Sequence, residues 1–293
     1  MQKNVAAYII FLILIPFQVV RAGWYITEQS HDKFGNRSFS STFIRDSIIR
    51  FDHPTSISIM NLNDTSVTLI FAQHRAYWHG TVAQLNRTTS HMALEQLTKL
   101  LAYAPEQKKQ EIKKAIAAFK KKQALPDSAR NFPQVQVINT GRHDTLLGFE
   151  TTVYKIVIDS TLKQMVWVTR QVHPYHDSDI NKILSFSRAM SPFAIENSLG
   201  HSKAYMALLR SGYILKSINY SSDGNTLVTT VTKIKRTKIP PAIFQVPPGY
   251  VESSLENIMI LDMSNNILKP QNIAPDDDVP ADGLPPLPPP DNN

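Results

Sequence analysis

The sequence between residues 38 and 61 reads SFSSTFIRDSIIRFDHPTSISIMN and contains three short runs that are rich in β-branched and aromatic residues. The runs at 38–45, 47–52 and 56–61 are separated only by short turn-like segments, a pattern typical of β-strands. A parallel connection needs a crossover of about a dozen residues or more, so this close spacing favours an antiparallel meander. A Rossmann-type nucleotide-binding enzyme is therefore disfavoured.

The same enrichment predicts strands on both sides of this stretch. They lie at 24–29, 66–72, 134–141, 149–159, 163–172, 213–220 and 226–235. Turns at Ser160-Thr161 and at Ser222-Asp223-Gly224-Asn225 predict two hairpins among them. Helices are expected at 89–104, 105–123 and 202–210, which makes the chain an α+β protein with an antiparallel sheet.

The predicted helix 105–123 is strongly basic. Ile112, Ala115, Ile116 and Phe119 fall on one face at helical spacing. Lysines fill the remaining positions, namely Lys108, Lys109, Lys113, Lys114, Lys120, Lys121 and Lys122. This pattern has two interpretations: a solvated surface helix, or a basic lid that faces anionic lipid or polyanion. In the second, Lys109, Lys113 and Lys120 are the candidates for contact with an anionic headgroup.

The first 22 residues have the three-part plan of a secretory signal peptide. Lys3 provides the positive region, Val5 to Val20 forms an apolar run, and Ala22 is a small residue suited to cleavage. An uncleaved anchor is the alternative, although the run is shorter than the roughly 20 residues of a spanning helix. A cleaved, periplasmic or secreted protein is therefore expected.

Composition sets further limits. The chain has 293 residues, 42% of them hydrophobic, which is enough for a core. It has no cysteine, which excludes disulfides, a thiolate nucleophile, cysteine-bound metal and a lipid-modified cysteine. Residues 23–269 carry 29 basic and 19 acidic side chains, a net charge of +10, whereas the residues after Lys269 contain five Asp and no basic residue.

These features divide the chain into three parts. Residues 1–22 are the predicted signal peptide, and residues 23–264 form one domain with a helical insert at about 89–124. Residues 265–293 are rich in proline and aspartate and are predicted to be a disordered or extended tail. Nucleic-acid binding, the usual inference from a basic composition, is disfavoured for an exported chain.

The sequence lacks the common catalytic motifs. The chain lacks a glycine-rich phosphate loop, HExxH, GxSxG and an EF-hand loop, so a non-enzymatic protein without a cofactor is expected. A weak candidate for a metal site is the cluster of His173, His176 and Asp177, whose alternative interpretation is a polar loop that caps a helix.

Aromatic residues give the candidates for an apolar site. Trp24, Trp78 and Trp167 lie in or beside predicted strands, and Phe43 lies within one. Packing in the core is one interpretation of these side chains. Lining an apolar ligand cavity is the other, because such cavities are mostly apolar and aromatic.

Six short fragments, spaced along the chain, resemble those of a known group of proteins. They are Ile49-Arg50-Phe51, Pro105-Glu106-Gln107-Lys108-Lys109, Leu147-Gly148-Phe149, Tyr154-Lys155-Ile156, Val166-Trp167-Val168-Thr169 and Phe244-Gln245-Val246-Pro247-Pro248-Gly249-Tyr250. Together they resemble a group of uncharacterised bacterial periplasmic proteins, similar in fold to the lipoprotein carriers LolA and LolB and to the stress sensor RseB. Members of that group often have a cysteine shortly after the Gly-aromatic pair, where this chain has Thr151 or Thr152.

The resemblance implies an incomplete antiparallel β-barrel with helices that cover its open mouth and a cavity that accepts acyl chains. The leading functional hypothesis is an envelope protein that binds an apolar or lipidated ligand. Two alternatives stay open: an envelope sensor or adaptor that binds another protein, and a metal-dependent hydrolase that uses the segment 173–179. The oligomeric state is not predicted.

Overall fold

The computed structural model describes residues 22–124, 133–176, 178–190, 199, 202–221 and 224–259. The predicted signal peptide up to residue 21, the predicted tail 265–293 and the candidate metal ligand Asp177 lie outside the described residues.

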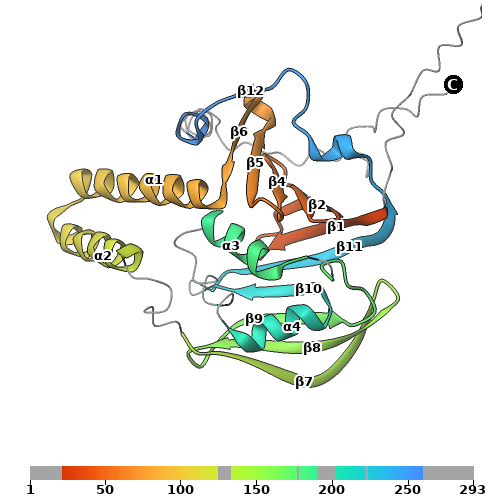
Figure 1. Ribbon diagram of the computed structural model, residues 1–293. Coiled ribbons are helices and arrows are strands. Elements are labelled where there is room, and N and C mark those ends of the chain that lie inside the picture. Colours follow the sequence, from red (N-terminus) through yellow and green to blue (C-terminus); the bar gives the residue numbers. More distant parts are fainter. Residues whose placement is uncertain are drawn as a thin grey trace, which may run out of the picture.

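Within these ranges, twelve strands form one curved, unclosed sheet in the order β12-β6-β5-β4-β3-β2-β1-β11-β10-β9-β8-β7 (Figure 1). Neighbouring strands are antiparallel, except that β12 runs parallel to β6. The strands are β1 (Ala22–Asp32), β2 (Arg37–Arg45), β3 (Ile48–Asp52), β4 (Ile57–Asn61), β5 (Ser66–Phe71), β6 (Ala76–Thr81), β7 (Val135–Leu146), β8 (Phe149–Ile158), β9 (Thr161–Thr169), β10 (Tyr213–Tyr220), β11 (Thr226–Lys238) and β12 (Val251–Glu252). The predicted α+β class with a curved antiparallel sheet is confirmed.

The N-terminal meander forms because its turns are short and its strands alternate. Asp46 and Thr65 take positive φ angles of 54° and 58° at two of the tight turns. On the strands, Ile26, Ile44 and Ile49 point to one face and are almost completely buried.

Two apolar cores lie against the sheet. The larger one joins the inner face of β1–β5 to α1, α3 and Leu255, and it also includes Tyr213 and Leu215 of β10. The smaller one packs Leu208 and other residues of α4 against β8 and β9, with Ile214 beside it. Because neighbouring residues of a strand point to opposite faces, the two cores lie on opposite sides of β10.

The helices are α1 (Val82–Tyr103), α2 (Glu106–Ala124), α3 (Ile180–Met190) and α4 (Lys203–Ser211). α1 begins earlier than the expected start near residue 89, because Thr81 and Gln84 form a capping box at its N-terminus. The α1–α2 pair extends away from the sheet, and α1 also packs against α3 (Figure 1).

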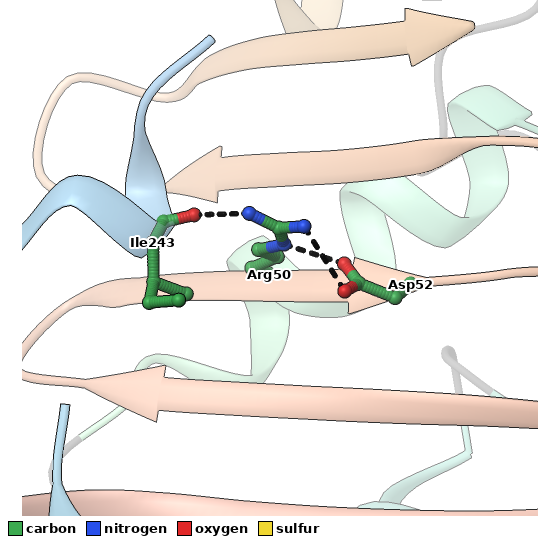
Figure 2. Close-up of polar contacts among 3 residues, drawn as sticks. All are labelled: Arg50, Asp52 and Ile243. Atoms are coloured by element: carbon green, nitrogen blue, oxygen red, sulfur yellow. Dashed lines mark hydrogen bonds and ion pairs between the residues drawn. The ribbon is translucent and has the colours of Figure 1, made fainter. Parts of the chain in front are cut away.

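A segment that follows β11 crosses the outer face of the meander and ends at the far edge of the sheet. It contains a 3-10 turn, η4 (Pro241–Phe244), and then pairs as β12 with β6. The guanidinium of Arg50 on β3 donates to the carbonyl of Ile243 and holds this segment in place (Figure 2). The Phe244–Tyr250 fragment of the predicted resemblance therefore belongs to a structural strap.

Candidate functional site

The predicted cavity residues do not meet in one place. Trp24 and Trp78 are half-buried against the larger core. Phe43 is on the opposite face of the sheet, where its ring centroid lies 4.9 Å from that of Tyr25. Trp167 on β9 is buried and belongs to neither core cluster.

Two adjoining hollows lie elsewhere, beside the start of β10 and the end of α4. Their volumes are about 230 and 250 Å³, and both are lined by Tyr175, Leu209 and Gly212. The first hollow is also lined by His173, His176, Ser178, Asp179, Ile180 and Arg210. The second is lined by Glu28, Tyr213, Ile214, Leu215, Lys216, Ser217, Thr229 and Val231. Taken together, they form a crevice of mixed character.

Gly212 permits this crevice because the chain passes very close to β9 there. A Cβ atom at this position would lie 2.0 Å from the carbonyl oxygen of Thr169. The glycine therefore ends α4 and lets β10 begin directly against β9.

A half-buried acid, Glu28, lines the second hollow. The hydroxyl of Tyr213 donates to Oε1 of Glu28 at 3.5 Å. Burial raises the pKa of Glu28 above its ordinary value, and the hydrogen bond from Tyr213 opposes that shift. Tyr213 also contacts Tyr175, with ring centroids 5.7 Å apart, and burial raises the pKa of both hydroxyls.

A cation lines the same hollow. The ammonium of Lys216 lies 4.9 Å from the centre of the Trp167 ring. Lys216 therefore connects the crevice to the predicted candidate Trp167: it lines the second hollow and makes a cation–π contact with the Trp167 ring.

The histidine segment lines the first hollow. His173 makes a hydrogen bond through Nε2 to the carbonyl of Arg170 at 2.9 Å. His176 and Asp179 lie in the same lining. Among the described residues, no group of three or more His, Asp or Glu side chains is placed to hold a metal ion.

The candidate headgroup lysines are all on α2. Lys113 and Lys120 are exposed, whereas Lys109 is half-buried and pairs with Glu106 at 2.5 Å. On the predicted apolar face of α2, Ile112 and Ile116 are half-buried and Phe119 is buried. Ala115, on the same face, is exposed. In the described part of the chain, the helices are too short or too polar to span a membrane.

Sequence reasoning missed Glu28, Tyr175 and Tyr213. A signal for Glu28 was present, because it follows Trp24 and Ile26 at alternating positions of a predicted strand. A carboxylate at an inward-facing position is uncommon unless it has a partner. The two tyrosines gave no such signal, since their convergence depends on long-range contacts.

Comparison with known proteins places the chain in a family. The family model described as "Domain of unknown function (DUF4412)" matches residues 64–250, from the turn before β5 to the strap. No curated protein matches the chain significantly.

Several solved structures match this chain at low similarity. A structure of PNGF-II has 10% sequence identity and a TM-score of 0.37, and the match covers 82% of this chain but 32% of that one, so this chain spans about a third of its length. The MucA/MucB complex of Pseudomonas aeruginosa matches with 8% identity, a TM-score of 0.31 and coverages of 77% and 56%. A LolA superfamily protein of Nitrosomonas europaea has 8% identity, a TM-score of 0.25 and coverages of 76% and 89%. The match to a domain of unknown function confirms the prediction that the chain belongs to an uncharacterised group of proteins.

Proposed function

This chain belongs to the DUF4412 family, and we propose that it is an exported, non-enzymatic protein of the cell envelope that binds an apolar or lipidated ligand. The binding site is the crevice beside β10. The protein acts in the periplasm after its signal peptide has been removed. In this role the domain holds a ligand and catalyses no reaction.

The crevice is the observation that carries the proposal. Its two hollows share the side chains of Tyr175 and Leu209, so one elongated ligand can fill both. Ligand sites are typically about 300–1,000 Å³ and combine apolar walls with a few polar groups. Leu215 and Val231 provide apolar wall, while Glu28 and Lys216 provide polar groups. Each CH₂ group of an acyl chain buried here contributes about 0.8 kcal/mol.

The lysines of α2 support an anionic surface as the place of loading. α2 presents exposed Lys113 and Lys120 on a helix pair that extends away from the sheet (Figure 1). Near its end, α1 adds Leu100 and Tyr103, which are 59% and 89% exposed. Basic side chains beside exposed apolar ones are typical of surfaces that bind anionic lipid.

The ligand proposal is tested with the full chain purified from its own envelope. Native mass spectrometry should detect a bound lipid or lipopeptide. Leu209→Trp fills both hollows and should abolish that mass shift, whereas Leu147→Trp, at an exposed turn between β7 and β8, should leave it unchanged. The proposal is overturned if delipidated protein takes up no lipid or lipopeptide, or if both variants bind equally.

The loading surface needs a separate test. Replacing Lys109, Lys113 and Lys120 with Gln should weaken binding to vesicles that contain phosphatidylglycerol but not to vesicles of phosphatidylcholine. The matched control replaces three exposed lysines of the sheet, Lys155, Lys233 and Lys238. Equal loss in both triple variants would mean that only net charge matters.

A second candidate function, an adaptor that binds another protein, is favoured by the edge strand β7. In the described part of the chain, this strand pairs with β8 alone, so the other side of its backbone has no strand partner there, and Ile138 is 43% exposed. Extended peptides bind such edges by strand addition.

The adaptor function has its own experiment. A partner recovered with the full chain should be lost with Ile138→Asp and kept with Leu227→Asp, which alters a side chain of matching exposure, 44%, on β11. Deleting residues 265–293 tests whether the acidic tail is needed as a tether. Retention of the partner by all three variants would exclude this function.

A further inference from the structure

We infer that Glu28 is a recognition site for a protonated amine carried by an apolar ligand. This inference rests on the proposed function, because it assumes that the crevice holds a ligand, and it specifies the polar group of that ligand. The amine is that of an aminolipid headgroup or of a peptide terminus, and both present the same ammonium group.

Glu28 lies on a central strand of the sheet, in the wall of the second hollow. On β1 it pairs with Val231 of β11 and Ser40 of β2, so its carboxylate lies in the middle of the sheet. It lines the second hollow and is half-buried there. The hydroxyl of Tyr213 is its hydrogen-bond donor, and the carboxylate has capacity to accept further hydrogen bonds.

The charge around the Glu28 carboxylate indicates what it can bind. Among the described residues, no ion pair involves Glu28. Lys216 lines the same hollow, but its ammonium lies over the Trp167 ring. Partial burial without a counter-ion disfavours the charged carboxylate, and a bound cation relieves that cost. A ligand ammonium provides that cation.

The aromatic rings favour an organic ammonium over a metal ion. Tyr175 and Tyr213 line the same hollow as the carboxylate, and their ring centroids are 5.7 Å apart. Ammonium groups are attracted to the faces of aromatic rings, and the carbon atoms attached to the nitrogen pack against them. A divalent metal needs several oxygen or nitrogen ligands, and among the described residues that line this hollow Glu28 is the one with a carboxylate.

The electrostatic surroundings make the binding pH-dependent. The groups that face Glu28 are Tyr213 and Lys216 on β10 and Tyr175 in the loop before α3. His173, His176, Asp179 and Arg210 line the adjoining hollow. Burial raises the pKa of the Glu28 carboxyl. Amine binding requires the ionised carboxylate, so it is strong above that pKa and is lost as the pH falls through it.

The test compares two probes that differ only in their polar end, dodecylamine and 1-dodecanol, with the full chain. Isothermal titration calorimetry should show that Glu28→Gln weakens dodecylamine binding by about tenfold or more and leaves dodecanol binding unchanged. Glu28→Asp, which keeps the charge on a shorter side chain, should bind dodecylamine with intermediate affinity. Glu111→Gln, on exposed α2, is the matched control and should bind as the wild type does.

The outcomes separate the two proposals. If dodecylamine and dodecanol bind equally well to the wild type and to Glu28→Gln, the amine site is wrong while the apolar crevice stands. If neither probe binds, the proposed function fails. Phosphatidylethanolamine against its N-acetylated form, and an apolar peptide against its N-acetylated form, then distinguish the lipid from the peptide source of the amine.

Discussion

Arg50 and Asp52, two residues apart on β3, form a two-point ion pair on the outer face of the sheet: Nε donates to Oδ1 at 2.5 Å and Nη2 donates to Oδ2 at 3.0 Å (Figure 2). The third nitrogen of the guanidinium donates to the carbonyl of Ile243. Asp52 thus orients Arg50 toward the strap, which connects the middle of the sheet to its edge. The arrangement joins two fragments of the sequence that are almost two hundred residues apart.

Arg50→Met should destabilise the protein by about 2 kcal/mol, because it removes charge-assisted hydrogen bonds and leaves Asp52 half-buried without its partner. Urea denaturation followed by circular dichroism measures this loss. The control is Lys99→Met, which breaks the exposed Lys99–Glu95 pair and should cost less than about 0.5 kcal/mol. Equal effects in the two variants would contradict a structural role of Arg50.

Glu28→Gln should make the protein more stable than the wild type near neutral pH. The folded-state pKa of Glu28 is raised by burial, so its favourable contribution exists below the unfolded pKa and is lost as the pH rises through the folded one. Glutamine stays neutral and still accepts the hydrogen bond of Tyr213. Urea denaturation at a series of pH values should show that the advantage of the variant disappears at acid pH. An advantage that does not change with pH would contradict the assignment.

Gly212→Ala should cost about 3 kcal/mol or more, since its Cβ would lie 2.0 Å from the Thr169 carbonyl oxygen and the backbone would have to move. Gly141→Ala is the control: it has a φ of 70° with open space around it, so its cost comes from backbone conformation alone, about 1–2 kcal/mol. Thermal unfolding of both variants checks the difference. A smaller loss for Gly212→Ala than for Gly141→Ala would show that the contact is readily relieved.

Thr81→Ala should destabilise the protein by about 1 kcal/mol, because the Thr81 hydroxyl accepts from the backbone N–H of Gln84 at the start of α1. Thr98→Ala, in the same helix, removes only a bond to the preceding carbonyl of Leu94 and should have a smaller effect. Urea denaturation of the two variants measures the difference. A loss for Thr98→Ala as large as that for Thr81→Ala would show that the cap contributes little.

Local patterns predicted most of the secondary structure. The strands 38–45, 47–52 and 56–61 coincide closely with β2, β3 and β4 because their alternation and turns are encoded within a few residues. β6 and β12 were not predicted. β12 is two residues long and exists only because the strap brings it beside β6.

The candidate site was much less predictable than the strands. Aromatic residues suit an apolar cavity, but Trp24 and Trp78 pack against the larger core, Phe43 lies on the opposite face of the sheet, and Trp167 belongs to neither core cluster. The crevice is built from β1, β10, β11, α4 and the loop before α3, which are far apart in the sequence. Residue type alone could not bring these segments together.

The sequence by itself determined the antiparallel meander, the basic face of α2 and the absence of cysteine chemistry, because each depends on composition or on contacts between near neighbours. Only the tertiary structure decided that β1 pairs with β11, which joins the two halves of the sheet and places Glu28 between them. Alternation tells which face of a strand is apolar, but it does not tell which strand will lie beside it. The environment of Glu28 is therefore a property of the assembled sheet.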